Sequence, residues 1–269
     1  MVATAPQHLV NNVIAGDCVQ VLSRLPAECI DLTITSPPYD DLRSYKGRST
    51  NNRVDLRALG ASLLRATRHN GVACMVLNDQ TVDAHKTLTT FRTAVAWVDL
   101  GWNLFECCIY HRHGKPGGWW NKRFRVDHEY ILIFFKGDKP AVFHKEPLMV
   151  ASKNVGRVWQ GSTRKNDDDL RPVEPVVVQP LKCRGTIWSY LSPAHDSNRL
   201  KQKHPATFPD DLARDLILCF SDPGRLILDP MCGSGTTLVE ARRNGRQFIG
   251  IDIVPEYCQI ARQRLAANK

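Results

Sequence analysis

The sequence predicts an α/β fold, in which a Rossmann-like, mostly parallel sheet carries helices on both faces. Three observations support this prediction. Apolar strands alternate with helices in the first third of the chain and again after Pro205, and this alternation is typical of βαβ units. Two of the strands run directly into turns rich in Pro or Gly. The 269 residues, 43% of them hydrophobic, suffice for one large α/β domain with an insertion or for two small domains.

The N-terminal part of the chain contains most of the expected elements. Ile30–Thr35 is apolar enough for a buried parallel strand and leads straight into Ser36. A loop rich in Gly, Ser and Asn follows at 40–53. The other elements expected before residue 136 are, in chain order, strand Val10–Ile14, helix Cys18–Arg24, helix Val54–Arg68, strand Val72–Leu77, helix Leu88–Leu100, and strands Trp102–Tyr110 and His128–Phe135.

Residues 136–203 break this pattern into short pieces separated by Pro, Gly and charged residues, and we expect an inserted, irregular module there. Regular alternation then returns. The elements expected after Pro205 are helix Pro209–Phe220, strand Arg225–Leu228, helix Thr236–Asn244, strand Gln247–Ile251 and helix Pro255–Ala267. The predicted organisation is therefore one domain in two parts, 1–135 and 204–269, with the segment 136–203 between them.

The composition favours a polyanionic partner and a reducing compartment. The net charge is +9, and Lys and Arg side chains neutralise phosphates in non-specific nucleic-acid binding. Nine cysteines form an odd set without paired spacing, so we expect reduced thiols. The apolar run Tyr130–Phe135 is too short to cross a bilayer, and residues 1–16 lack the features of a signal peptide. We therefore expect a cytoplasmic protein without a membrane partner.

A glycine-rich turn, Asp229–Thr237, follows an apolar strand and opens a helix. Glycines let the backbone approach a ligand closely, and free amides at a helix start attract carboxylates. One strand later comes Asp252, an acidic residue able to accept hydrogen bonds from both ribose hydroxyls. The turn lacks the Gly-Lys-Ser/Thr of a phosphate loop and is too short for the dinucleotide fingerprint. An ordinary tight turn is the alternative to a site for a nucleoside cofactor without pyrophosphate.

A second turn, Ser36-Pro37-Pro38-Tyr39, directly follows the buried strand. Its two prolines hold the backbone extended and stiff. The Ser36 hydroxyl and the Pro37 carbonyl are acceptors, and Tyr39 has an aromatic face, so the turn suits a flat substrate that bears an amino group. Two acceptors that pull an exocyclic amine towards tetrahedral geometry free its lone pair for attack on a sulfonium methyl group. A structural Pro-Pro turn with a packing tyrosine is the alternative.

With both turns, the chain resembles the S-adenosylmethionine-dependent DNA amino-methyltransferases, which methylate cytosine N4 or adenine N6. That family pairs a Ser/Asp/Asn-Pro-Pro-Tyr/Phe motif with an Asp-Pro-Phe-Cys-Gly-Ser-Gly-Thr-like motif, and here Met231 replaces the Phe. The first motif precedes the second with an irregular segment between them, which resembles the permuted β group. The resemblance covers 10–135 and 204–269, and it implies a permuted class I methyltransferase fold.

The resemblance also implies roles for single residues. Gly16-Asp17 resembles the family's acidic contact to the cofactor adenine, and 204–209 resembles its cofactor-side motif. The residues implied to hold and activate the target base are Ser36, Pro37, Pro38 and Tyr39. The residues implied to bind S-adenosylmethionine are Asp17, His204, Phe208, Asp229, Pro230, Cys232, Gly233, Ser234, Gly235, Thr236 and Asp252.

The implied substrate is a base flipped out of double-stranded DNA. Ser in the first position of the tetrapeptide is more typical of cytosine N4 enzymes, and Asp or Asn of adenine N6 enzymes, so cytosine N4 is expected and adenine N6 is the alternative. The loop 111–125 interleaves basic and aromatic groups, and the basic segment 136–203 is the expected target-recognition segment. The predicted DNA-contacting residues are Arg43, Lys115, Trp119, Trp120, Lys122, Arg123, Arg164 and Lys165.

Other interpretations of the sequence are weaker. Methylation of RNA or of a protein amide uses a similar Asn-Pro-Pro-Tyr turn, but the motif order and the basic insertion argue against it. A catalytically inactive DNA-binding protein would not need both motifs intact. Cys232 lacks the Pro-Cys context of a cytosine C5 nucleophile, and the close residues Cys107, Cys108, His111 and His113 lack a CxxC, so we expect no metal. Relatives are commonly dimers, and a homodimer and a cognate restriction endonuclease are candidate partners of a bacterial, archaeal or phage enzyme.

Overall fold

The computed structural model describes residues 3–38, 54–113, 124–164, 170–191, 200–201 and 208–268, with the side chains of Arg164 and Leu170 excepted. It divides into two compact units. The first comprises Met1–His144 and Thr186–Lys269, and the second comprises Lys145–Gly185. No helix of the described residues is long and apolar enough to span a membrane.

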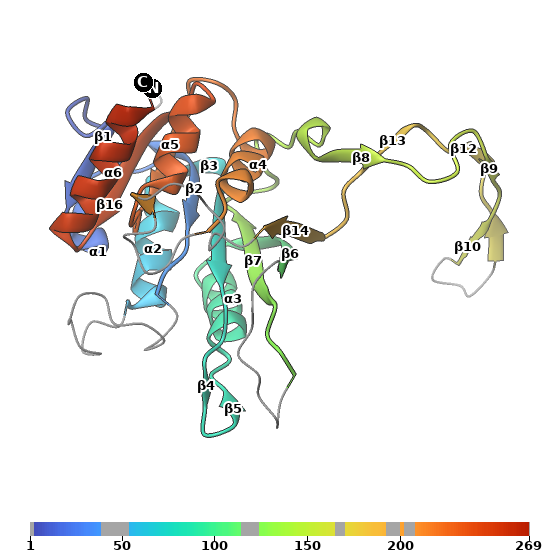
Figure 1. Ribbon diagram of the computed structural model, residues 1–269, viewed down its shortest axis with the longest axis horizontal. Coiled ribbons are helices and arrows are strands. Elements are labelled where there is room, and N and C mark those ends of the chain that lie inside the picture. Colours follow the sequence, from blue (N-terminus) through green and yellow to red (C-terminus); the bar gives the residue numbers. More distant parts are fainter. Residues whose placement is uncertain are drawn as a thin grey trace. The chain divides into compact units, whose positions relative to one another are not determined.

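The first unit is built on one eight-stranded sheet, whose order is β1-β16-β15-β2-β3-β7-β6-β14 (Figure 1). The first five strands in this order run parallel, β7 is antiparallel to both of its neighbours, and β14 is parallel to β6. The strands are β1 (Asn12–Ala15), β2 (Ile30–Thr35), β3 (Thr67–Leu77), β6 (Asn103–His113), β7 (His128–Phe135), β14 (Ile187–Leu191), β15 (Leu226–Asp229) and β16 (Gln247–Asp252). The predicted mostly parallel α/β fold is confirmed.

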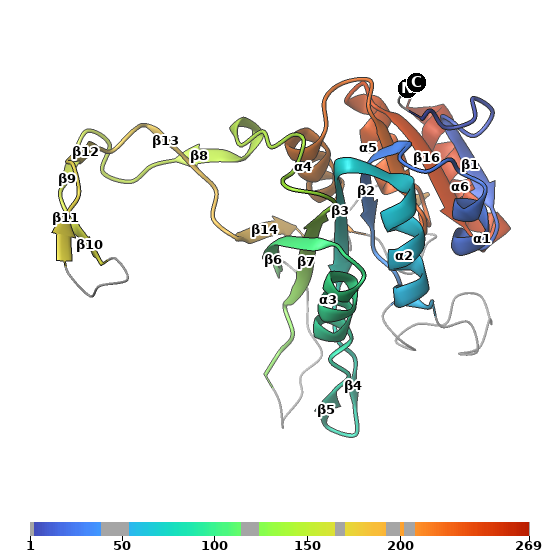
Figure 2. The same cartoon turned by 180° about the vertical axis from the view of Figure 1, so that it is seen from behind.

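Helices cover both faces of this sheet (Figures 1 and 2). On one face lie α1 (Cys18–Ser23), α2 (Leu56–Ala66) and α3 (Thr89–Asp99). On the other lie α4 (Asp210–Phe220), α5 (Thr236–Arg243) and α6 (Pro255–Ala267). The expected helices are all present, with ends shifted by a few residues. The two short strands β4 (Thr81–Val82) and β5 (His85–Lys86) form a hairpin that the sequence pattern did not predict.

The core beneath α2 and α3 shows how individual residues determine this packing. Trp97 and Trp102 stack with their ring centroids 5.4 Å apart, and each indole N–H donates to a backbone carbonyl of α2 or its start. A Cβ at Gly60 would approach the Trp97 ring to 2.5 Å. Glycine is therefore needed on α2 for α3 to come this close, and buried aromatic rings with satisfied N–H groups anchor the layer.

The second unit is a two-stranded ribbon rather than the irregular segment that we predicted. Its short strands pair antiparallel in three successive ladders. They are β8 (Met149–Ala151) with β13 (Leu181–Cys183), β9 (Val158–Trp159) with β12 (Val176–Val177), and β10 (Ser162–Arg164) with β11 (Leu170–Pro172), preceded by the short 3-10 helix η1 (Glu146–Leu148). Pieces of two or three residues are too short to show an alternating pattern in sequence. Strand β14, which also lies within 136–203, belongs instead to the main sheet.

Candidate active site

The two turns singled out in the sequence follow neighbouring strands. β15 pairs parallel with β2, with Ile227 opposite Leu32 and Leu228 opposite Thr33. Parallel neighbours end at the same edge of a sheet, so the chain after Thr35 and the chain after Asp229 leave the sheet side by side. Thr35 and Asp229, the last residues of the two strands, are both buried there. The residue directly before the Ser-Pro-Pro turn and the residue that opens the glycine turn therefore end neighbouring strands at one edge of the sheet.

The glycine turn is held by hydrogen bonds at each of its central residues. The Gly233 N–H donates to Asp252 Oδ2 at 2.8 Å, and the Gly235 N–H donates to the carbonyl of Cys232 at 2.7 Å. Gly233 and Gly235 have φ values of +48° and +80°, in the left-handed region that glycine adopts at least cost. A Cβ at Gly235 would also lie 2.8 Å from the Cβ of Ala261 on α6. Conformation thus favours glycine at both positions, and packing against α6 requires it at Gly235.

The start of α5 is not capped by a side chain of the described residues, and Gly235 occupies the N-cap position. The first amides of a helix have no acceptor within the helix itself, and the helix dipole favours negative charge there. This end of α5 therefore suits a carboxylate.

Asp252, at the end of β16, binds the chain that follows β1 at the same edge of the sheet. Its backbone carbonyl accepts from the Gly16 N–H at 2.9 Å, and its Oδ1 accepts from the Val254 N–H at 2.8 Å. Asp17 follows Gly16, caps α1 through the Gln20 N–H, and is half-buried. Two carboxylates from different strand ends thus flank one edge, and each oxygen of Asp252 that accepts a backbone N–H retains a second lone pair for a hydroxyl.

Asp229 is the buried acid of the site. Burial raises its pKa to about 7, against the lowering effect of hydrogen bonds from Thr237 and Met231, and the neighbouring charge of Asp252 raises it further. Thr237 Oγ1 donates to Asp229 Oδ2 at 2.7 Å, and the Met231 N–H donates to Oδ1 at 3.1 Å. Burial likewise raises the pKa of Asp252. A positively charged neighbour would stabilise the ionised form of both carboxylates.

Cys232 lies inside the same turn and is buried. Burial raises the pKa of its thiol well above the usual value, and the nearby charges of Asp229 and Asp252 act in the same direction. Its sulfur packs against Gly250 of β16. A thiol in this environment stays neutral, and only the thiolate is an effective nucleophile.

The Ser-Pro-Pro turn is described as far as Pro38. Pro37 is buried, whereas Ser36 and Pro38 are half-buried at the edge of the sheet. Of the residues predicted to bind cofactor, Phe208 is buried directly before α4, and Pro230, Ser234 and Thr236 all belong to the glycine turn. The predicted site residues outside the described part of the chain are Tyr39, Arg43, Lys115, Trp119, Trp120, Lys122, Arg123, Lys165 and His204, and of Arg164 only the backbone is described.

Several residues at this edge were missed in the sequence. Thr237, the last residue of the glycine turn, donates to Asp229 but was not among the predicted cofactor-binding residues. Asn78 and Asp79 follow β3, the neighbour of β2, and are both buried. Asp79 Oδ1 accepts from the Thr90 N–H of α3 at 2.8 Å. A polar pair directly after the apolar run Val72–Leu77 was the signal that could have found them.

The arrangement can hold a nucleoside that carries an amino-acid tail. Asp17 and Asp252 flank a place for ribose and base, the start of α5 suits a carboxylate, and Asp229 suits a cationic group. Acceptors of the adjoining Ser-Pro-Pro turn suit an amino group. Within the described residues, no group of three or more His, Cys, Asp or Glu side chains could hold a metal ion.

Comparison with known proteins gives consistent similarities. A family model described as DNA methylase, covering N6 and N4 enzymes, matches residues 30–263. The chain is 36% identical over 261 residues to the orphan methyltransferase M.BamHII of Bacillus amyloliquefaciens, covering 93% of this chain and 90% of that protein. It is 27% identical over 262 residues to the DNA adenine methyltransferase YhdJ of Escherichia coli (strain K12), covering 94% of this chain and 82% of that protein.

Solved structures show the same fold. The cytosine-N4-specific PvuII DNA methyltransferase superimposes with a TM-score of 0.68 at 19% identity, covering 94% of this chain and 85% of that one. The DNA modification methylase TTHA0409 of Thermus thermophilus, solved in complex with S-adenosyl-L-methionine, has a TM-score of 0.63 at 24% identity and covers 96% of this chain and 93% of that one.

Proposed function

The chain belongs to the S-adenosylmethionine-dependent DNA methylase family of N6-adenine and N4-cytosine enzymes, and on this premise we propose that it methylates the exocyclic N4 of cytosine at a specific DNA site. The observation that carries the proposal is the parallel pairing of β2 with β15. Because of it, the predicted base-binding turn and the predicted cofactor turn adjoin at one sheet edge. The target base is flipped out of the duplex to reach that edge.

S-adenosylmethionine, when bound, supplies a sulfonium methyl group. The protein's own groups in this proposal hold and orient the two reactants. Asp252 and Asp17 accept hydrogen bonds from the nucleoside part, the first amides of α5 bind the carboxylate, and Asp229 faces the positive charge of the amino-acid part. The raised pKa values of Asp229 and Asp252 support this assignment, because a cationic ligand favours the ionised form of both acids.

The Ser36 hydroxyl and the Pro37 carbonyl accept the two hydrogens of the target amine, and Tyr39 stacks on the base. The amine nitrogen would then form the new N–C bond as the C–S bond breaks, S-adenosylhomocysteine would leave, and the surplus proton of the amine would pass to solvent. No covalent bond between enzyme and base is needed. This agrees with a neutral, buried Cys232.

The choice of cytosine rests on Ser36, the first residue of the tetrapeptide. The structural neighbour from the PvuII system is named as cytosine-N4-specific. Adenine N6 is the second candidate, because the curated relative YhdJ is named as a DNA adenine methyltransferase. A homodimer and a cognate endonuclease are further proposals, as is DNA contact through Arg43, the loop 111–125 and the target-recognition segment 136–203.

Product analysis tests this proposal. The purified protein is incubated with unmethylated DNA and S-adenosylmethionine carrying a labelled methyl group, and the DNA is digested to nucleosides for mass spectrometry. We expect labelled N4-methylcytosine. Labelled N6-methyladenine would replace the first candidate by the second, and label found only in RNA or protein would contradict DNA as the substrate. A Ser36→Ala variant tests the role of the Ser36 hydroxyl and should give less product than the wild type.

A further inference from the structure

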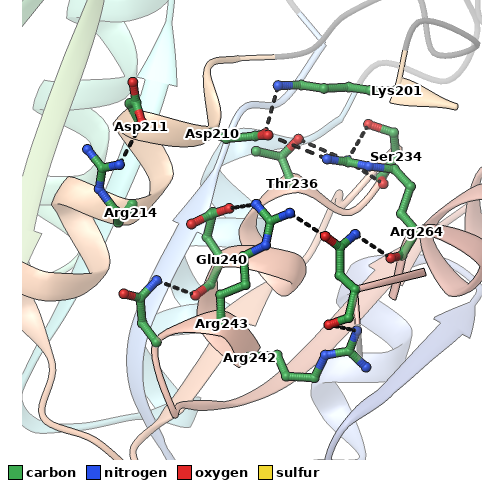
Figure 3. Close-up of polar contacts among 12 residues, drawn as sticks. Lys201, Asp210, Asp211, Arg214, Ser234, Thr236, Glu240, Arg242, Arg243 and Arg264 are labelled. Carbon is green, nitrogen blue, oxygen red and sulfur yellow. Dashed lines mark hydrogen bonds and ion pairs between the residues drawn. The ribbon is translucent and has the colours of Figure 1, made fainter. Parts of the chain in front are cut away.

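A buried ionic cluster joins three segments behind the glycine turn (Figure 3). Asp210 is the first residue of α4. Its Oδ1 lies 2.7 Å from Lys201 Nζ and 3.6 Å from Arg264 Nη2. The side chains of Lys201 and Arg264 are each 1% exposed, and that of Asp210 is 30% exposed. Residues 201, 210 and 264 thus meet around one carboxylate, although they come from separate segments of the chain.

Arg264 also reaches the glycine turn. From α6, its Nη1 donates to the Ser234 carbonyl at 2.8 Å and lies 3.3 Å from Ser234 Oγ and 3.2 Å from Thr236 Oγ1. Ser234 stands between the two left-handed glycines, where the backbone has little conformational preference of its own. Figure 3 shows the guanidinium lying between this turn and Asp210. Arg264 therefore holds the Ser234 carbonyl, whereas Asp252 and Cys232 hold the N–H groups of the two flanking glycines.

A buried ion pair is a poor source of stability, because the loss of hydration offsets much of the attraction. Breaking such a pair is nevertheless costly, because removing one partner leaves a buried charge without compensation. The pair therefore keeps its partners in one arrangement. Asp210 directly follows the predicted cofactor-side segment 204–209, whereas Ser234 and Thr236 belong to the predicted cofactor turn. The cluster thus connects the end of the one segment with the other.

We propose that Asp210, Arg264 and Lys201 position the glycine turn for S-adenosylmethionine, with Arg264 as the positioning residue that transmits the arrangement from α4 to Ser234. This inference rests on the proposed role of 229–237 in cofactor binding. Arg264 does not touch the reacting atoms in this proposal. Its removal should raise the Kd for the cofactor and leave catalysis at saturating cofactor almost unchanged.

The sequence provides a matched control in the next residue of α4. Asp211 is also acidic and also ion-paired, at 2.7 Å from Arg214, but its side chain is 63% exposed and lies apart from the cluster (Figure 3). We expect Asp210→Asn and Arg264→Met to weaken binding of S-adenosylmethionine by about tenfold, the scale of one lost charge-assisted hydrogen bond. Asp211→Asn should bind like the wild type. Isothermal titration calorimetry on the full chain without DNA measures all three.

Kinetics separate positioning from a general structural effect. We expect the KM for S-adenosylmethionine to rise in Asp210→Asn and Arg264→Met, while kcat and the KM for DNA change little. Arg264→Lys keeps the charge but cannot span Asp210 and Ser234 with one ammonium group, so its affinity should lie between those of the wild type and Arg264→Met. It also supplies the comparison if Asp210→Asn does not fold.

Unchanged cofactor affinity in Asp210→Asn, Arg264→Met and Arg264→Lys would overturn the inference, as would an equal loss in Asp211→Asn. A variant that unfolds at lower temperature but binds the cofactor like the wild type below that temperature would overturn it as well. A wild-type protein that binds no S-adenosylmethionine would instead contradict the proposed cofactor site itself.

Discussion

The raised pKa of Asp229 predicts that the affinity for S-adenosylmethionine depends on pH. Burial raises the pKa of Asp229 to about 7 in the ligand-free protein, whereas a cationic ligand needs the ionised carboxylate. We predict that the Kd for S-adenosylmethionine rises by about tenfold from pH 8 to pH 6, because one proton must then leave Asp229 on binding. Calorimetry at both pH values measures this change. Asp229→Asn should bind more weakly and lose most of the pH dependence, and a flat profile in the wild type would contradict the assigned role.

Tyr39 is the residue whose predicted role concerns the base alone. We expect Tyr39→Ala to bind S-adenosylmethionine like the wild type but to lose about ten- to hundredfold in turnover, the scale of one base-stacking contact. Steady-state kinetics at saturating cofactor and DNA measure this loss. Tyr39→Phe keeps the ring and should retain most activity. Equal turnover by Tyr39→Ala would refute the stacking role.

At the scale of single residues, the sequence predicted site residues where they lie close together in the chain. Asp229, Gly233 and Gly235 lie within one short stretch, so their grouping needed no knowledge of the fold. The pairing of β15 with β2 and the hydrogen bond of Arg264 with Ser234 join residues far apart in the chain. Contacts of that kind depend on strand order and helix packing, which a single sequence does not specify.

At the scale of elements, the junction of β15, the glycine turn and α5 is the most constrained part of the site. Gly235 combines a φ of +80° with a Cβ position only 2.8 Å from Ala261. We predict that Gly235→Ala lowers the free energy of unfolding by about 2–4 kcal/mol, from left-handed strain together with overpacking. It should also weaken cofactor binding. Urea unfolding and calorimetry measure the two effects.

Gly245, which follows α5, provides the control for this prediction. Its φ is +74°, but a Cβ there would meet nothing within 4 Å. Gly245→Ala should therefore cost only about 1–2 kcal/mol, from the strain alone, and leave cofactor affinity unchanged. An equal stability loss in the two variants would show that contact with α6 is unimportant.

Most elements of the first unit were predicted to within a few residues, whereas the strands of two or three residues and strand β14 were not. Strands β2 and β7 have the predicted limits, and α6 matches the predicted helix. Strand β3 begins at Thr67 instead of Val72, because α2 passes into it without a loop. Strand β14 was hidden in a segment broken by Pro and Gly, and only its pairing with β6 makes it part of the sheet.

At the scale of the whole molecule, the second unit can be tested apart from the first. Residues Lys145–Gly185 form an antiparallel ribbon with exposed basic and apolar side chains, among them Lys153, Arg157, Trp159 and Lys182. A two-stranded ribbon can enter the major groove of DNA. We predict that replacing 145–185 by a short Gly/Ser linker preserves binding of S-adenosylmethionine and abolishes site-specific methylation.

Calorimetry and sequencing of methylated sites check this prediction. If the shortened protein methylated the same sites at the original rate, the segment would have no part in target recognition. Loss of cofactor binding together with methylation would show instead that the first unit needs the second for its own stability.

The central claim concerns the whole edge of the sheet, where the chain after β2 and the chain after β15 must face one another across the reacting atoms. A crystal structure of the protein with bound S-adenosylmethionine tests it most directly. We expect the cofactor to lie over the carboxyl ends of β15 and β16, with its methyl carbon directed at the space in front of Ser36 and Pro37. A cofactor bound elsewhere, or a methyl group directed away from Ser36 and Pro37, would contradict the claim.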